Sequence, residues 1–217
     1  MKPTRPELPR EFVAVHKRRR MIEAMAELSA EQGYEATKIA DIVSRAGVAR
    51  KTLYDNFDGK QDLFLAAFDF CTAELRSNVE EACGSTGGGW QQRIESGLAA
   101  VLRYVVERPA AARMCLVEAQ SATPAASARY DAAMRDFVSL LKRSVPANVD
   151  LPDTIEESLV GGVAWILHQQ IRRDGAGRAG DLLPELSEFI LSPYHGVDKV
   201  GTQPGGESDS TVADSSI

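Results

Sequence analysis

The apolar residues of this chain recur at helical spacing, and no segment shows the alternation of apolar and polar residues that is typical of a strand. Residues 12–31 form the first helical pattern, and Gly33 follows it as a helix stop. Two short patterns come next, at 38–46 and 47–57, and a long one begins at residue 60. Three helices in the first 60 residues, with the last two short and closely joined, have the arrangement of a helix-turn-helix unit.

The same pattern predicts where these helices begin and which side chains they bury. Thr37 stands before the first short helix and offers an N-cap oxygen. The short helices are expected to enclose a small core of four residues: Ile42, Val48, Leu53 and Phe57. The long helix carries its apolar residues on one side: Leu63, Phe64, Ala67, Phe68, Cys71 and Leu75.

Beyond the long helix, glycine and proline separate further helical patterns. The segment 84–90, GSTGGGW, is the best candidate for a hinge between domains. Prolines mark the starts and stops of the helices that follow. These helices are expected at 90–107, 109–122, 125–145, 153–173 and 182–192.

These patterns predict an all-α protein. We expect an N-terminal three-helix domain at 12–60 and a larger helical domain at 61–194. The arm at 1–11 is rich in proline and charge and is expected to be mobile. The polar, Gly/Ser-rich tail at 195–217 is expected to be disordered.

The helix at 153–173 is apolar over an unusually wide arc. One side carries Ile155, Leu159, Val163 and Ile166, and a second side carries Val160, Ala164, Leu167 and Ile171. Such a helix needs cover on both sides. Two copies of this helix and of the one at 182–192, related by a two-fold axis, would bury the surplus in a four-helix bundle, which predicts a homodimer. The alternative is that helices of the same chain cover both sides.

Charge divides the chain into a basic start and an acidic remainder. The net charge is −6, but residues 1–60 hold 12 Lys and Arg against 9 Asp and Glu. This difference favours contact of the start, rather than the remainder, with a polyanion. No apolar run is long enough to cross a membrane and no secretion signal is visible, and three cysteines without metal-ligand spacing fit a reducing cytoplasm. We therefore expect a cytoplasmic protein without metal or cofactor.

The second short helix opens with two cations, Arg50 and Lys51, where the helix dipole disfavours positive charge. Their place is explained if this end of the helix enters the major groove of DNA, where Arg and Lys donate to the O6/N7 edge of guanine. Thr52 could then contact a phosphate or a thymine methyl group. Tyr54 and Asn56 could reach phosphates from the same helix.

The segment GYEATKIADIVSRAGVARKTLYDNFDGKQDLF (33–64) resembles the DNA-binding signature of the TetR family of bacterial transcriptional regulators. The matching features are the Gly and Thr before the first short helix, the AGV turn, TLY, and the Phe and Lys that follow. The resemblance implies a regulator, more often a repressor, that binds a palindromic DNA operator as a homodimer. It implies phosphate contacts from Thr37, Tyr54, Asn56 and Lys60, and base or groove contacts from Arg50, Lys51 and Thr52, with Arg45 as a marginal candidate.

Three positions depart from the family pattern. Ala49 replaces the usual Ser, whose hydroxyl caps the recognition helix, and this loss should cost about 0.5–2 kcal/mol. Lys51 replaces a small residue, so no known operator sequence transfers to this chain. Asn56 replaces a more frequent His or Tyr and can still donate to a phosphate.

The resemblance also implies a small-molecule pocket in the second domain, whose occupancy changes the separation of the two DNA-binding units. The effector is not readable from the sequence, but a mixed pocket for a largely apolar molecule is expected. Glu118 needs a partner there, which could be a cationic ligand, Arg113, Arg129 or His168. The candidate lining residues are Tyr104, Met114, Glu118, Tyr130, Phe137, Trp165 and His168.

Other functions compete with this interpretation. A redox-responsive regulator could use Cys71, Cys83 or Cys115, and a helical protein could bind small molecules without a DNA target. An enzyme is not expected, because no catalytic or phosphate-loop motif is visible. The basic run at 17–20 is either a solvated helix face or, with the arm before it, a further contact to DNA.

Overall fold

The computed structural model describes residues 10–146, 149, 151–152 and 154–195. The arm before residue 10 and the tail after residue 195 lie outside the described residues, so the expectations for them stay predictions. Within the described part, every regular element is helical, as the sequence predicts. The elements are α1 (Arg10–Gln32), α2 (Ile39–Ala46), α3 (Arg50–Tyr54), α4 (Lys60–Ser85), α5 (Trp90–Glu107), α6 (Pro109–Arg113), η1 (Met114–Glu118), α7 (Ala119–Ala122), α8 (Pro124–Ser144), α9 (Thr154–Asp174), η2 (Ala176–Leu182), α10 (Leu183–Leu191) and η3 (Ser192–Tyr194).

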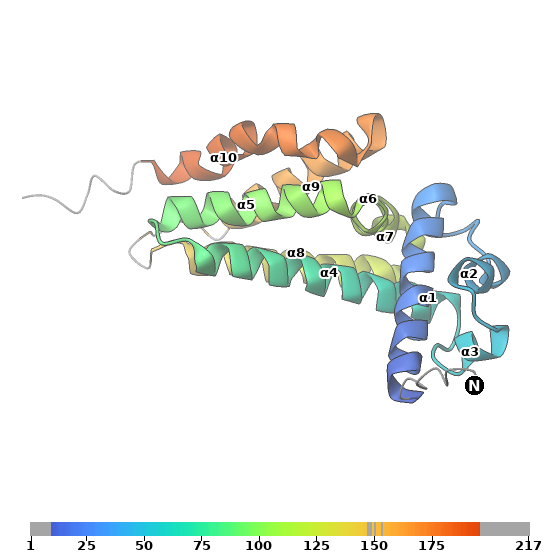
Figure 1. Ribbon diagram of the computed structural model, residues 1–217. Helices are drawn as coiled ribbons and strands as arrows, with labels where there is room; N and C mark the ends of the chain where they lie inside the picture. The colour runs from blue at the N-terminus through green and yellow to red at the C-terminus, as the bar shows by residue number, and fades with distance from the viewer. Residues whose placement is uncertain (1–9, 147–148, 150, 153, 196–217) are drawn as a thin grey trace, which may run out of the picture.

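Helices α1 to α3 form a small N-terminal unit, which we call the head (residues 10–59). In Figure 1, α1 crosses the long helices of the remaining chain steeply, and α2 and α3 lie on its far side. Gly47 ends α2 in the left-handed conformation (φ 59°), where a residue with a Cβ atom is strained. This glycine makes the tight turn that joins the two short helices.

The expected core of the head is present. Ile42, Leu53 and Phe57 are buried, and Val48 packs against them partly buried. One expectation is wrong: Lys38, not Thr37, occupies the N-cap position of α2, and no side chain caps this helix. The Thr37 hydroxyl instead turns inward and donates to the Gly33 carbonyl at 2.8 Å.

Helix α4 leads from the head into the larger unit, which we call the body (residues 60–195). Five of the six residues on its predicted buried side are buried, and Leu75 is half-buried. The Gly-rich segment expected to divide the chain is a short turn between α4 and α5, two helices that pack along their lengths (Figure 1). The hinge therefore lies inside the body, and the step from head to body occurs at the start of α4.

The segment predicted as one helix at 109–122 has a different middle. Between α6 and α7 lies η1, a π-helical turn with wider hydrogen-bonded rings. The π-helical turn adds to the helix a local bulge that apolar periodicity does not reveal. The helices predicted at 90–107 and 125–145 appear as α5 and α8 with nearly the same bounds.

Helix α9 is covered by its own chain more fully than the sequence suggests. The residues of both predicted apolar sides are buried or half-buried, so they alone do not require a partner. A third side is exposed and carries Trp165, which is 61% exposed, and Gly161. The Phe189 ring of α10 rests on Gly162, where a Cβ atom would lie 2.8 Å from the ring, and is itself 38% exposed. An apolar surface thus remains on α9 and α10.

Candidate nucleic-acid interface and effector cavity

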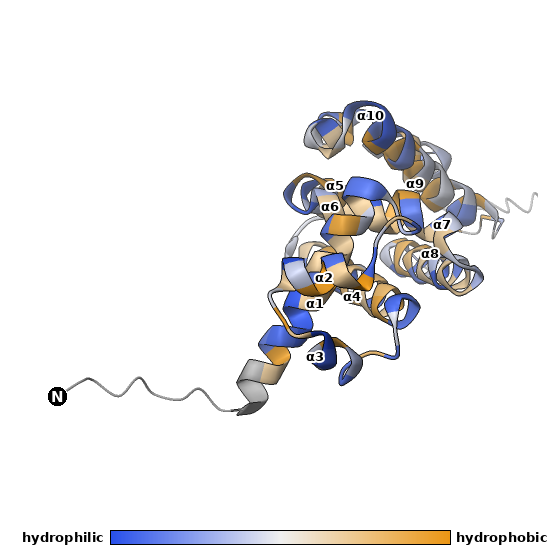
Figure 2. Ribbon diagram, turned by 90° about the vertical axis from the view of Figure 1, so that its right-hand side faces the viewer, coloured by the Kyte–Doolittle hydropathy of each residue, from blue (hydrophilic) through white to orange (hydrophobic). Residues whose placement is uncertain are grey.

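Helix α3 presents its first turn to the outside of the head. Leu53 is fully buried against the head core and fixes the rotation of the helix, so Arg50 and Lys51 point to solvent. No side chain caps this helix, in keeping with Ala49 at its N-cap position. Seen from the head end, α3 is strongly hydrophilic (Figure 2). The structure thus gives the two cations the exposure that contact with DNA requires.

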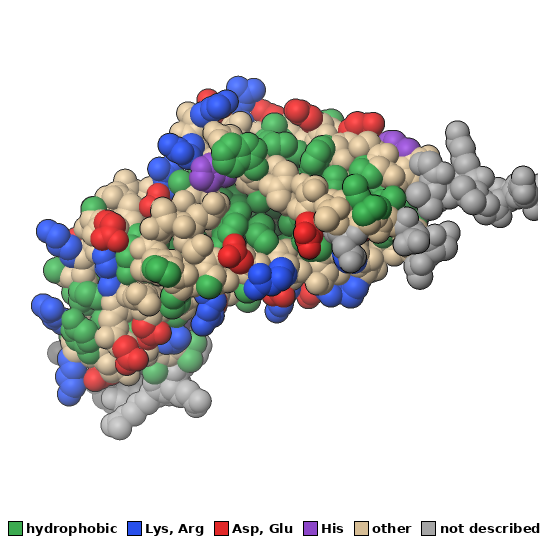
Figure 3. Space-filling view, turned by 180° about the vertical axis from the view of Figure 1, so that it is seen from behind, with side chains coloured by type: hydrophobic (Ala, Val, Ile, Leu, Met, Phe, Trp, Pro, Cys, Tyr) green, Lys and Arg blue, Asp and Glu red, His purple; other side chains and the backbone are tan. Residues whose placement is uncertain are grey.

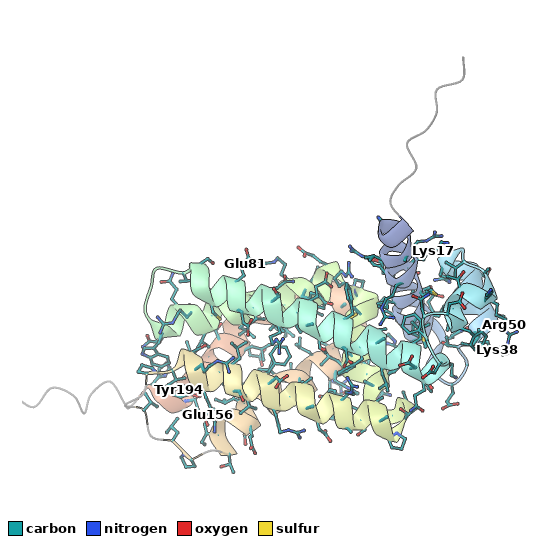
Figure 4. All side chains as sticks on the ribbon, turned by 90° about the horizontal axis from the view of Figure 1, so that it is seen from below. Lys17, Lys38, Arg50, Glu81, Glu156 and Tyr194 are labelled. Atoms are coloured by element: carbon teal, nitrogen blue, oxygen red, sulfur yellow. The ribbon has the colours of Figure 1, made fainter. Side chains whose placement is uncertain are left out.

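Two further side chains share this outer surface. The Arg50 guanidinium stacks over the Tyr54 ring at 5.7 Å, and its Nη2 donates to the Tyr54 hydroxyl at 3.4 Å. Lys38, at the start of α2, is exposed at the same end of the head as Arg50 (Figure 4). Sequence reasoning missed Lys38, although its place beside the first turn of a helix was visible. We call Lys38, Arg50, Lys51 and Tyr54 the outer surface of the head.

Three of the four residues expected to contact phosphates instead form hydrogen bonds to backbone carbonyls of the head. Thr37 is only 1% exposed, and Asn56 Nδ2 donates to the Thr52 carbonyl at 2.8 Å. Lys60 Nζ donates to the carbonyls of Tyr34 at 3.1 Å and Glu35 at 3.3 Å. These side chains hold the short helices in place, and only Tyr54 remains on the outer surface of the head.

Arg45, the marginal candidate for a contact to DNA, instead joins α2 to α1. Its guanidinium binds both carboxylate oxygens of Glu31 at 2.9 Å and reaches Glu27 at 3.0 Å, which fastens α2 to α1. The hydrogen bond from Arg45 lowers the pKa of Glu31. Two cations of the basic run act similarly: Arg18 lies 4.4 Å over the Phe57 ring, and the Arg20 guanidinium lies beside Gly47. Part of this run therefore contacts the head while remaining exposed to solvent.

The body encloses an apolar cavity. Its walls come from α4, α5, α6, η1, α8, α9 and α10, and its empty volume is about 1100 Å³ with the open space at its mouth included. In the view from behind in Figure 3, hydrophobic side chains line the bottom of a recess in the body. The apolar lining is typical of a small-molecule site. Lining residues that sequence reasoning did not select include Leu75, Val79, Leu141, Val160 and Val163.

The structure brings three of the seven candidate lining residues to this cavity: Tyr104, Tyr130 and Phe137. The other four lie elsewhere. Met114 is fully buried in the core between head and body, and Trp165 is on the surface, stacked on His168 at 5.6 Å. His168 Nδ1 lies 2.8 Å from the Leu116 carbonyl.

Glu118 faces the head, not the cavity. Its Oε2 accepts a hydrogen bond from the Tyr34 backbone N–H at 3.4 Å. The partner expected for this carboxylate is therefore neither a ligand nor one of the named cations, but the turn after α1. Helix η1 thus borders the cavity with Cys115 and Leu116 and contacts the head with its last residue.

One polar cluster interrupts the apolar wall. The Tyr104 hydroxyl lies 3.1 Å from both the Cys71 carbonyl and Glu74 Oε2, and Arg108 pairs with Glu74 at 3.3 Å. Burial raises the pKa of Tyr104, so the phenol stays protonated at neutral pH. The expected mixed pocket is thus lined almost wholly by apolar groups, and Tyr104 joins its wall to this cluster.

No group of three or more His, Cys, Asp or Glu side chains is placed to hold a metal ion among the residues that the structure describes. Over the same ranges, no helix combines the length and apolar character needed to span a bilayer.

Comparison with known proteins identifies the head. Residues 21–67 match the family model of bacterial regulatory proteins of the tetR family. Over these residues the chain therefore has the N-terminal domain of the TetR family. The match covers α2, α3 and the start of α4, which include the outer surface of the head. The matched residues thus correspond to the part of these bacterial regulators that the family model describes.

Curated relatives are also regulators by name. The chain is 49% identical over 41 residues to the uncharacterized HTH-type transcriptional regulator YezE of Bacillus subtilis, which is 19% of this chain and 21% of YezE. It is 30% identical over 98 residues to the HTH-type transcriptional activator FasR of Mycolicibacterium smegmatis, which is 45% of this chain and 42% of FasR. The matches thus span less than half of either relative.

Solved structures extend the likeness in fold to about four fifths of the chain. The fatty acid degradation regulator FadR of Bacillus halodurans superposes with a TM-score of 0.72 at 14% identity and covers 80% of this chain and 97% of its own. FadR of Bacillus subtilis, solved in complex with stearoyl-CoA, superposes with a TM-score of 0.69 at 16% identity, covering 82% and 99%. At this identity the likeness concerns the fold alone.

Proposed function

We propose that this protein is a TetR-family repressor that binds a palindromic operator as a homodimer and leaves it when an apolar molecule fills the cavity. One observation carries the proposal: η1 borders the cavity through Cys115 and Leu116 and contacts the head through Glu118. A molecule in the cavity could therefore affect the head through this single turn.

We assign recognition of bases to the start of α3. Arg50 and Lys51 are exposed there and carry donors suited to the O6 and N7 atoms of guanine. Thr52, half-exposed beside them, is suited to a thymine methyl group. Tyr54 and Lys38 flank this turn and are assigned to phosphates, which position the helix without reading sequence.

We assign dimerisation to the exposed apolar surface of α9 and α10. Trp165 and Phe189 are large apolar side chains left exposed on neighbouring helices. A second copy of the same surface, related by a two-fold axis, would cover both in a four-helix bundle. The two heads would then meet successive major grooves about 34–36 Å apart, which requires a palindromic site.

A long acyl chain is the effector that we propose. The cavity is lined almost wholly by aliphatic and aromatic side chains, so it favours an extended apolar molecule. FadR of Bacillus subtilis, which shares the fold, was solved with stearoyl-CoA, and this supports an acyl ligand without fixing its length or carrier.

The release of DNA is proposed to be a population shift. A ligand changes the affinity for the operator only if it binds two arrangements of the protein unequally. Helix η1 is suited to this because its Leu116 carbonyl lies against His168, on which Trp165 of the dimer surface is stacked. The same turn thus adjoins the cavity, the head and the proposed dimer surface.

The operator can be found and the effector tested in one series. Fragments of genomic DNA that the purified protein retains are sequenced, and affinity for one of them is measured by fluorescence anisotropy against salt. Several phosphate contacts predict a steep loss of affinity as salt rises. Stearoyl-CoA is then expected to weaken binding about tenfold or more, since allosteric coupling is typically 5–150-fold.

Two outcomes contradict the proposal. Unchanged affinity with stearoyl-CoA would remove the acyl effector, and increased affinity would reverse the sign of regulation. For the dimer, Trp165→Glu is expected to give a monomer in sedimentation and to lose operator binding. Glu157→Ala, on an exposed position of the same helix, is the matched control and should change neither.

A further inference from the structure

Two of the three free cysteines face the cavity from different elements. Cys71 lies on α4, Cys115 lies in η1, and both line the cavity wall. Helices α4 and η1 pack against each other, and the side chains of Cys71 and Cys115 interact across this contact. Neither the fold nor the proposed function uses the chemistry of these thiols.

The two thiols form an asymmetric pair. Cys115 donates a hydrogen bond to Cys71, and this bond lowers the pKa of Cys71 and raises that of Cys115. The Tyr104 hydroxyl and the Arg108 guanidinium further favour the thiolate of Cys71. Burial adds to the rise at Cys115. Cys71 is therefore the sulfur with nucleophilic character, and Cys115 is a protonated thiol next to it.

We propose that Cys71 and Cys115 are an oxidation site that a hydroperoxide on an apolar group converts into a disulfide. The class of oxidant follows from the access route. Cys71 is only 3% exposed and is reached through the apolar cavity, which favours an alkyl hydroperoxide over a strongly hydrated molecule. Cys83 also lines the cavity, but it lacks a partner thiol: its Sγ donates to the Arg93 carbonyl, and burial raises its pKa.

The reaction consists of two substitutions at oxygen and sulfur. The Cys71 thiolate attacks the terminal oxygen of the hydroperoxide, the O–O bond breaks, and the leaving alkoxide takes the proton that Cys71 released, which gives an alcohol. The Cys115 sulfur then attacks the sulfenic acid of Cys71, the S–O bond breaks, and hydroxide leaves as water with the Cys115 proton. Two thiols are thus oxidised by two electrons in total, and one hydroperoxide is reduced to an alcohol and water.

The disulfide would join α4, which leads into the head, to η1, which contacts the head through Glu118. It would restrain the cavity wall in the region that the proposed function uses for release of DNA. Any change in operator affinity on oxidation rests on that proposed function. Formation of the disulfide itself does not.

The test treats the reduced full-length chain with one equivalent of cumene hydroperoxide and maps the peptides by mass. A peptide pair linked through Cys71 and Cys115 is expected in the wild type and equally in Cys83→Ser. In Cys115→Ser, dimedone should trap a sulfenic acid at Cys71. In Cys71→Ser, Cys115 should remain unlabelled over the same time. Hydrogen peroxide should act about tenfold more slowly, because the apolar cavity disfavours a hydrated oxidant.

Absence of the linked pair in the wild type, or linkage through Cys83, would overturn the site. Equal rates for the two peroxides would overturn the apolar class of oxidant. The wild-type map requires no variant, and circular dichroism checks the folding of each variant, with Cys115→Ala as the substitute if Cys115→Ser does not fold. Operator binding by the reduced protein is measured separately, so failure of the proposed function and failure of the oxidation site are told apart.

Discussion

In the head, most of the polar side chains expected at DNA are bonded to the head itself, whereas the candidate ligand site of the body has few polar groups. Lys60 and Asn56 donate to backbone carbonyls, and Arg45 binds two carboxylates of α1. In the body, α4, α5, α8 and α9 form most of the wall of a cavity that is lined mainly by apolar groups. The two regions thus reach function by different means.

The two regions differ in how the shapes of their helices are maintained. A recognition helix of five residues cannot keep its own shape, because isolated short helices are unstable in water. The helix is therefore fixed by its own buried Leu53, and at its end by the hydrogen bond from Asn56 to the Thr52 carbonyl. The walls of the cavity in the body are instead mainly helices of 18 residues or more.

The largest effect is expected from truncation in the head core. Leu53→Ala should destabilise the head by about 2–5 kcal/mol, because Leu53 is fully buried and its removal leaves a cavity. Leu75→Ala, at a half-buried position already facing empty space, should cost clearly less. Urea unfolding followed by circular dichroism measures both. Equal losses of stability would show that the two regions are packed alike.

Base recognition should separate from phosphate contact within α3. Arg50→Ala or Lys51→Ala is expected to reduce discrimination between the operator and unrelated DNA by about 1–3 kcal/mol for each lost base contact. Tyr54→Phe should weaken binding to all sequences alike, because a phosphate contact carries no sequence information. Anisotropy titrations with the operator and a scrambled duplex give both values. Identical behaviour of the three variants would refute this division of roles.

The sequence predicts the head better than the body, and the reason is physical. Turn glycines and the apolar core at Ile42, Leu53 and Phe57 are local features that sequence spacing reports directly. The inward turn of Thr37 depends on where α1 ends in space, which spacing does not contain. The prediction of a hinge between domains at 84–90 was wrong, because glycines occur in a turn between packed helices as readily as at a domain boundary.

In the body, a lining residue and a core residue have the same sequence pattern. Val163 lines the cavity and also belongs to the apolar core, so helical periodicity cannot separate the two roles. Aromatic residues were a partial guide, since Tyr130 and Phe137 line the cavity while Trp165 is exposed. The cavity arises from how seven elements meet, including a π-helical turn that no apolar pattern predicts.

A smaller effect is expected at the contact between the two regions. Glu118→Gln keeps the size of the side chain but weakens the bond to the Tyr34 N–H, so operator affinity without ligand should change by about 1 kcal/mol or less. The weakening of DNA binding by stearoyl-CoA should fall in this variant. Glu95→Gln, an exposed change on α5, is the control. If the effect of the ligand is unchanged, release does not pass through Glu118.

The smallest effect concerns the brace between α2 and α1 and appears only with pH. Arg45 lowers the pKa of Glu31 in the folded state, so the folded state binds the proton of Glu31 less well than the unfolded state does. The resulting stabilisation is present above the pKa of Glu31 in the unfolded chain, and it is lost as the pH falls through the lowered pKa. Both groups are exposed, so the loss is a minor part of acid unfolding. We expect Arg45→Gln to remove this part: below about pH 4, where a free glutamate protonates, its unfolding midpoint should approach that of the wild type. Thermal unfolding at pH 3 and pH 7 measures this, and a difference between the two proteins that is independent of pH would mean that Arg45 stabilises α2 by packing rather than by charge.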